Sequence, residues 1–337
     1  MKILVIDDKS NDGSYPRKGL LEVLEQRQKI TCDIIEPDPE ALKQKLEKIQ
    51  AGEYDLIIVD YMLERARTIF KTGTALYSLI HAYAHRTPIY LISVKTAPTN
   101  QIGDFDLFIN DDAINNHDAF KADIQSHIAL RSCTSLSVFV ALIQCPEALQ
   151  DDIATMIKPI LAKPESNTQD NENQIPEKEI ADSLNLRLFR WLARSLLRKE
   201  GPLVCRAGAA GLLGISVDYF DSISPQFDNA LYNGIFNQSF DKRWWGVLLE
   251  DKVFEKTDPE NDLEKYPFKE AASKLLGATN KNDLSKCVVC QEPYPDGLGI
   301  VTDQENELLP VHISCSEFND TLPQEPFFRN PRVIEVA

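Results

Sequence analysis

Short, uninterrupted apolar runs alternate with segments of helical periodicity along the first 130 residues. Such a run, about four to eight residues long, is typical of a strand buried on both faces of a parallel sheet. Strands are predicted at 3–6, 32–35, 55–60, 89–93 and 106–109, and helices at 17–28, 39–50, 74–84 and 117–130. This alternation predicts an α/β fold with a doubly wound, five-stranded parallel sheet.

The rest of the 337-residue chain is expected to fold differently. Residues 131–182 are interpreted as a helical connector and a polar linker, because the stretch 163–179 is rich in amides, acids and proline and cannot bury a core. Residues 183–280 are expected to form a helical domain, and residues 281–337 a small zinc-binding module with a tail. The sheet domain is expected to span residues 1–130.

The formal net charge of -16 disfavours nucleic acid and anionic lipid as partners. No apolar run approaches the ~20 residues of a membrane-spanning helix, and the start MKILVIDD lacks the pattern of a secretory leader. Three of the seven cysteines cluster, which is typical of a metal site in a reducing compartment rather than of a disulfide framework. We therefore expect a cytoplasmic protein without a membrane partner.

Three carboxylates stand at the carboxyl ends of predicted strands. Asp7 and Asp8 follow the first strand, and Asp60 ends the third. Ligands of doubly wound sheets bind beyond these ends, where the strand order reverses. Clustered carboxylates repel one another, and a hard cation such as Mg²⁺ relieves that repulsion. The cation would also neutralise an incoming phosphoryl group and leave one carboxylate free as a nucleophile.

Five segments, in this order, resemble the receiver domains of response regulators, which are CheY-like and flavodoxin-like. They are VIDD (5–8), IIVDYML (57–63), Thr72-Gly73, LISVK (91–95) and DLFIN (106–110). The resemblance covers about the first 130 residues. It implies that Asp60 is the phosphoryl acceptor and that Mg²⁺ is held by Asp7, Asp8, Asp60 and the carbonyl of Met62.

The resemblance also identifies Ser93 as the switch hydroxyl that contacts the phosphoryl group and Phe108 as the aromatic residue that moves with it. One position departs from the family. The lysine expected at the end of the fifth strand is replaced by Asn110, followed by Asp111. This replacement removes a charge-assisted contact to the phosphoryl group. Lys95 lies two residues beyond Ser93, where the family has no lysine.

A second group of residues has the spacing of a metal site. Cys287 and Cys290 are separated by two residues, as are His312 and Cys315. Two such pairs of soft ligands match a tetrahedral Cys₃His zinc site, and the pattern resembles a treble-clef or zinc-ribbon module. With four protein ligands no coordination position is left for water, so a structural Zn²⁺ is expected.

A basic stripe follows the linker. Its arginines recur at helical spacing, at Arg187, Arg190, Arg194 and Arg198. The stripe could bind an acidic partner, a nucleic acid backbone or an acidic face of the same chain.

A weak helix-turn-helix pattern comes next. Ala210, Gly214 and Phe220 match its small residue, turn and core position, but Asp218 and Asp221 fall on the presumed recognition helix and face phosphates poorly.

These features favour a response-regulator-like signalling protein that is not an enzyme. The receiver would accept phosphate at Asp60 from a phosphorelay, for instance from a sensor histidine kinase, and the helical and zinc regions would contact a protein partner. Two alternatives stay open. One is a pseudo-receiver adaptor without phosphorylation, in a multi-protein bacterial stress or conflict system. The other is a DNA-binding transcription regulator.

Overall fold

The structure is a computed structural model. It describes residues 1–8, 30–63, 69–93, 105–110, 117–133, 135–161, 177–256, 266–301, 308–317 and 332–334. The predicted helix 17–28 and residues 163–176 of the polar segment lie outside these ranges. The chain divides into two compact units. The sheet unit comprises residues 1–142 and 157–194, and the C-terminal unit comprises residues 143–156 and 195–337.

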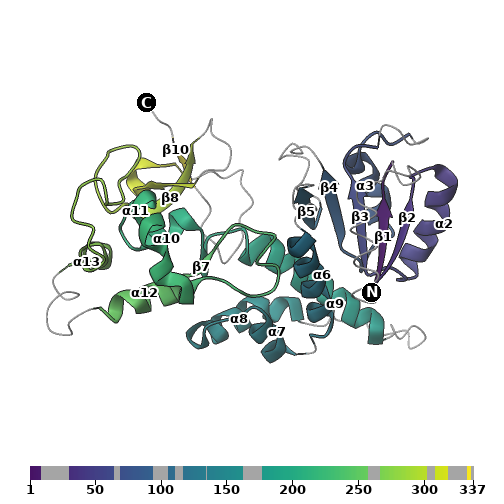
Figure 1. The fold of residues 1–337 in the computed structure, drawn as a ribbon, viewed down its shortest axis with the longest axis horizontal. Helices are drawn as coiled ribbons and strands as arrows, with labels where there is room; N and C mark the ends of the chain where they lie inside the picture. The colour runs from purple at the N-terminus through teal and green to yellow at the C-terminus, as the bar shows by residue number, and fades with distance from the viewer. Residues whose placement is uncertain are drawn as a thin grey trace, which may run out of the picture. The chain divides into compact units, whose positions relative to one another are not determined.

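The sheet unit contains the predicted five-stranded parallel sheet (Figure 1). Its strands are β1 (Lys2–Ile6), β2 (Thr31–Ile35), β3 (Leu56–Asp60), β4 (Ile89–Ser93) and β5 (Leu107–Asn110). Their order is β2-β1-β3-β4-β5, and every neighbouring pair is parallel. This is the doubly wound order of flavodoxin-like folds, so the predicted fold class is confirmed.

Helices cover both faces of the sheet. Helices α2 (Pro39–Gln50) and α3 (Gly73–His81) share one hydrophobic core with the strand residues that alternate toward them. Tyr90 of β4 points to the opposite face, where its ring lies 5.3 Å from that of His127 in α6 (His117–Arg131). The sheet is therefore buried between two layers, as its continuous apolar strands predict.

Helix α9 (Glu177–Trp191) also packs on the face that α6 covers, although it follows the polar segment. The ring of Phe189, which is 1% exposed, lies 4.7 Å from that of His127. One π-helical turn, Leu192–Leu196, continues α9 and contains the boundary between the two units.

Residues 131–161 are helical, as predicted. They contain α7 (Leu136–Leu142), a 3₁₀ turn (Glu147–Leu149) and α8 (Gln150–Leu161). None of the described helices has the length and apolar character needed to cross a bilayer.

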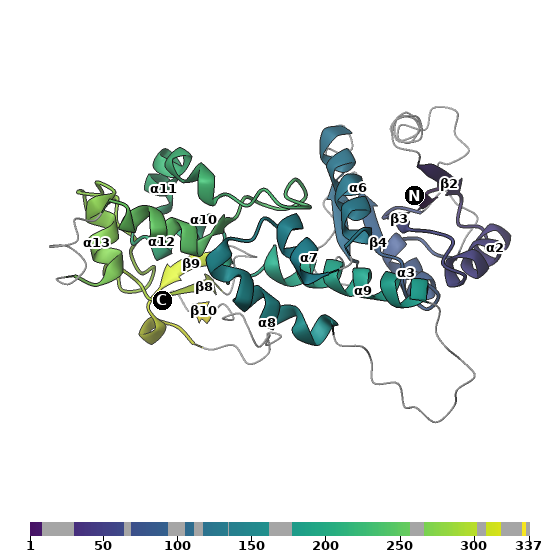
Figure 2. The ribbon, with the colours of Figure 1, turned by 90° about the horizontal axis from the view of Figure 1, so that it is seen from below.

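The C-terminal unit is mainly helical (Figure 2). It contains α10 (Arg206–Leu212), α11 (Val217–Ile223), a 3₁₀ helix (Ser224–Ala230), α12 (Gly246–Phe254) and α13 (Phe268–Leu275). A two-stranded sheet joins β6 (Leu203–Val204) to β7 (Trp244–Trp245). Trp244 belongs to the hydrophobic core that these helices enclose, together with Phe220 and Leu249.

A small sheet follows in the same unit. Strands β8 (Gly297–Val301) and β9 (Leu308–Val311) form an antiparallel hairpin, and β10 (Arg332–Ile334) pairs with β8 in parallel. A short 3₁₀ turn, Ile313–Cys315, begins directly after β9.

Candidate functional site

Asp7, Asp8 and Asp60 converge at the carboxyl edge of the large sheet. Their carboxylate oxygens all lie within 4.8 Å of one another, and the three residues are 1%, 7% and 5% exposed. Oxygen ligands at this spacing fit a hard divalent cation, which relieves the repulsion between buried carboxylates. The sequence therefore placed these side chains together correctly, while Mg²⁺ binding stays a prediction.

The strand pairing causes this convergence. The N–H of Asp7 donates to the carbonyl of Ile35, the last residue of β2, at 3.0 Å. Strands β1 and β3 are neighbours, with Ile6 opposite Val59, so the residues that follow Ile6 reach the same edge as Asp60. Parallel strands in register end together, and acids at those ends are forced into proximity.

The segment after β3 is held close to Asp60. Met62 forms an isolated antiparallel bridge with Thr72, and the N–H of Gly73 donates to the carbonyl of Tyr61 at 2.8 Å. A Cβ atom at Gly73 would lie 2.3 Å from the carbonyl oxygen of Asp60. Helix α3 therefore starts against the backbone of the proposed acceptor, and this approach requires glycine.

Ser93 lies on the same edge. It is the last residue of β4, is 1% exposed and pairs with Asn110 at the end of β5. Phe108 is half-buried and packs against the core shared with α2 and α3. Lys95, Asp111 and the side chain of Asn110 lie outside the described residues. The switch roles of Ser93 and Phe108 stay predictions.

Another buried carboxylate, Asp106, lies away from this cluster, and the sequence alone predicts no role for it. Asp106 precedes β5, at the amino edge of the sheet, and its side chain is fully buried. It accepts from the N–H of Ile89 at 2.9 Å, from Nε of Arg190 at 2.7 Å and from a terminal nitrogen of Arg194 at 2.9 Å. Two arginines of the basic stripe are therefore bound by an acid of the same chain, one of the three alternatives that the sequence left open.

His127 also has a partner that the sequence did not reveal. Its Nε2 is hydrogen-bonded to the hydroxyl of Tyr90, and both residues are buried beneath α9. Burial, together with the nearby Arg131 guanidinium, lowers the pKa of His127 to about 3. The ring is therefore neutral at pH 7, and its hydrogen bond to Tyr90 joins two uncharged groups.

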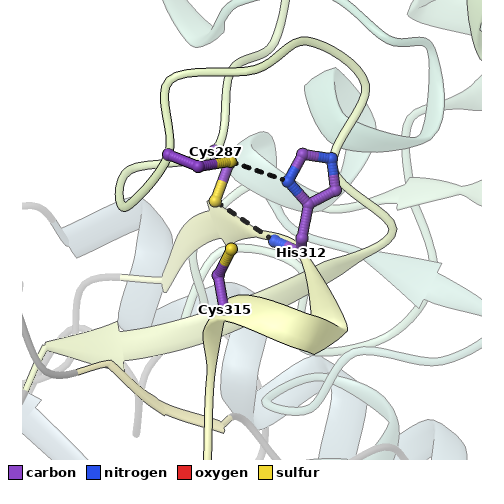
Figure 3. A group of neighbouring side chains, drawn as sticks. Cys287, His312 and Cys315 are labelled. Atoms are coloured by element: carbon purple, nitrogen blue, oxygen red, sulfur yellow. Dashed lines mark hydrogen bonds between the residues drawn. The ribbon is translucent and has the colours of Figure 1, made fainter.

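The predicted metal ligands converge in the C-terminal unit. One ligand atom from each of Cys287, Cys290, His312 and Cys315 lies within 4.8 Å of all the others. Sγ of Cys290 lies 3.2 Å from Nδ1 of His312. Figure 3 shows Cys287, His312 and Cys315 pointing toward one another. Three sulfur atoms and one imidazole nitrogen at this spacing fit the donor set of a tetrahedral zinc site.

Two backbone features place these ligands. The first pair lies in a tight turn, in which the N–H of Gln291 donates to the carbonyl of Cys287 at 2.9 Å. His312 follows β9 and Cys315 ends the 3₁₀ turn after it. Burial raises the pKa of the Cys287 thiol, but hydrogen bonds from the N–H groups of Cys290, His312 and Val289 outweigh it and bring the pKa to about 6. These donors favour the thiolate, which is the form that binds metal.

The weak helix-turn-helix pattern coincides with two short helices. Helices α10 and α11 are joined through Gly214, whose φ is +70°, and Phe220 is buried between them and their neighbours. Asp221 of α11 forms an ion pair with Arg206 at 3.1 Å. Asp218 and Asp221 lie on α11, where carboxylates would face phosphates poorly, and Asp106 binds Arg190 of the basic stripe.

No protein-family profile matches the chain, and no curated protein matches it significantly. Among solved structures, the chain is similar to RcsB from Salmonella enterica serovar Typhimurium, bound to promoter rprA in the presence of phosphomimetic BeF3-. The sequence identity is 13%, the TM-score is 0.28, and the match covers 55% of this chain and 99% of RcsB.

Proposed function

We propose that this chain is a response-regulator-like signalling protein. Its sheet unit would accept a phosphoryl group at Asp60, and its C-terminal unit would pass the signal on by contact with another protein. The observation that supports this proposal best is the convergence of three buried carboxylates within 4.8 Å at the carboxyl edge of the sheet. Buried carboxylates repel each other unless they share a cation or a proton, so this cluster is not expected of a purely structural edge.

In the proposed reaction a carboxylate oxygen of Asp60 attacks the phosphorus of a phosphodonor. The new O–P bond forms as the bond to the leaving group breaks, and the leaving group keeps the electron pair. Mg²⁺, held by Asp7, Asp8 and the carbonyl of Met62, would supply the positive charge that the phosphoryl oxygens need. The hydroxyl of Ser93, at the end of the neighbouring strand, would donate a hydrogen bond to one of those oxygens.

The experiment is incubation of the full chain with Mg²⁺ and acetyl phosphate, followed by intact-mass spectrometry. We expect one phosphoryl group per chain, lost in Asp60→Asn. Asp55→Asn is the matched control, because Asp55 immediately precedes the same strand at its opposite end. It should be phosphorylated as the wild type is. Equal phosphorylation of Asp60→Asn and wild type would refute the assignment.

The second candidate is a pseudo-receiver adaptor, which the replacement of the family lysine by Asn110 favours. Such an adaptor would bind its protein partner whether or not phosphodonor is present. No mass gain in the wild type, with no Mg²⁺ binding by isothermal titration, would favour the adaptor over the phosphorylated switch. Capture of the native protein with its partners, in wild type and Asp60→Asn, then separates a phosphorylation-dependent partner from a constant one.

A further inference from the structure

The Cys₃His cluster is not packed as a separate module. Among the described residues of its hydrophobic cluster, Cys287 and Val311 are buried, and Val288, Leu309 and Cys315 are partly buried against them. Apolar burial on this scale is far too small to hold residues 287–294, which we call the knuckle, and the β8–β9 hairpin folded. Something besides apolar burial must therefore fix the four ligands at their positions.

Residues 283–285, which precede the knuckle, are hydrogen-bonded to the turn between α10 and α11. The N–H of Ser216 donates to the carbonyl of Asp283 at 2.7 Å, and the N–H of Ser285 donates to the carbonyl of Gly214 at 3.1 Å. Ile215 forms an antiparallel bridge with Leu284. Ser216 is also the N-cap of α11, because its hydroxyl accepts from the N–H of Tyr219.

The other side of the knuckle is tied to the hairpin and to α13. The N–H of Val288 donates to the carbonyl of Pro310 in β9 at 3.0 Å. Tyr294 shares a hydrogen bond of 3.1 Å with the hydroxyl of Ser273, a fully buried residue of α13. Leu298 of β8 is the nearest neighbour of a Cβ built on Gly211 in α10. Residues 283–285, Tyr294 and Leu298 therefore join this region to the α10–α11 turn, to α13 and to α10.

We propose that one Zn²⁺ is bound by Cys287, Cys290, His312 and Cys315. Its binding stabilises the folded α10–α11 pair as well as the knuckle. Zinc fixes the knuckle, the knuckle holds residues 283–285 in place, and those residues close the turn at Gly214 to Ser216. Binding free energy at a structural zinc site is folding free energy, so it extends to every element that these hydrogen bonds join. This inference is independent of the chemistry proposed at Asp60.

The test uses the full chain and amide hydrogen exchange. Metal analysis should give one zinc per chain. Removal of zinc with a chelator at neutral pH should lower the protection of the Ser216 and Ser285 amides by roughly a hundredfold or more, and added Zn²⁺ should restore it. Amides of β3 and β4 in the sheet unit should be unchanged and serve as the internal reference.

A matched pair of variants completes the test. Cys290→Ser removes an exposed ligand, and Cys32→Ser changes a cysteine of β2 that is not a ligand. Cys290→Ser should lose zinc and the protection at Ser216, whereas Cys32→Ser should keep both. Absence of zinc from the wild type would overturn the site. Loss of zinc with unchanged protection at Ser216 and Ser285 would overturn the coupling to the helix pair.

Discussion

Nε of Arg190 donates to Oδ1 of Asp106 at 2.7 Å, across 84 residues of sequence. The bond joins α9 to the amino edge of the sheet, opposite the acid cluster. Asp106 is fully buried, whereas the side chains of Arg190 and Arg194 are 27% and 39% exposed. These ion pairs therefore hold α9 and the turn that continues it against the amino edge of the sheet.

Asp106→Asn should loosen α9 without unfolding the sheet. The substitution keeps the shape but removes the charge that two guanidinium groups contact, and we expect a loss of about 1–3 kcal/mol, below the cost of breaking a fully buried pair, because both arginines stay partly solvated. Amide exchange of α9 measures this loss. Arg187→Ala on the same helix is the control, because Nε of Arg187 has no hydrogen-bond partner among the residues that the structure describes. Equal protection of α9 in Asp106→Asn and wild type would contradict this assignment.

The stability of the sheet unit should fall in mild acid because of His127. Its folded-state pKa of about 3 lies below the ordinary value of 6.5, so the unfolded chain binds the proton first. Stability is therefore full above pH 6.5 and declines as the pH falls toward 3, by up to about 1.4 kcal/mol per pH unit. Urea denaturation at several pH values, with exchange at β4 identifying the transition of the sheet, measures the slope.

The matched control for this slope is His85→Gln, since His85 is exposed. His127→Phe, combined with Tyr90→Phe to avoid an unpaired phenol, should flatten the pH dependence, while His85→Gln should leave it as in the wild type. A slope that persists in the double variant would assign the effect to other groups.

Gly73→Ala should disturb the carboxyl edge of the sheet, where Asp60 lies. The added methyl would lie 2.3 Å from the carbonyl oxygen of Asp60 and 2.9 Å from a methyl of Val59, so the start of α3 must shift. Overpacking of this kind costs about 1–3 kcal/mol, and phosphorylation at Asp60 should fall with it. Gly211→Ala is the comparison, because its nearest neighbour, Leu298, is 3.8 Å away. It should be neutral or slightly stabilising, and a similar loss in both variants would show that the contact at Asp60 is not the cause.

Arg243 should be essential to the C-terminal unit. Its guanidinium is 8% exposed and donates to the carbonyls of Arg198 at 2.6 Å and Lys199 at 2.8 Å, and to the carboxylate of Glu200 at 3.2 Å. Arg243→Met removes these largely buried hydrogen bonds and should destabilise the unit by about 3–5 kcal/mol in thermal or urea unfolding.

The comparison for Arg243 is Arg206→Met, which removes an exposed pair with Asp221. Exposed ion pairs contribute about 0–1 kcal/mol, so its effect should be small. An equal loss in the free energy of unfolding for both variants would show that the buried hydrogen bonds of Arg243 do not stabilise this region.

Much of the structure of the sheet unit can be predicted from local sequence patterns. The helical spacing of Leu42, Leu46 and Ile49 predicts a helix at residues 39–50, where the structure has α2. In the structure Asp38 caps its start by accepting from the N–H groups of Glu40 and Ala41. The acid cluster was also predictable, since carboxylates at the ends of parallel strands meet at one edge. The spacing of the cysteine pairs similarly indicated which four residues converge in the C-terminal unit.

Other relationships depend on packing between distant segments. The sequence shows that Arg190 and Arg194 share a helical face, but only the docking of α9 beside α6 brings Asp106 to them. Likewise, nothing near Ser216 indicates that residues 283–285 will close its turn. Local pattern determined the strands, their acids and the ligand pairs, because these follow from periodicity and spacing. The tertiary structure alone decided which charged groups form ion pairs. Burial and long-range hydrogen bonds arise only when the elements are packed.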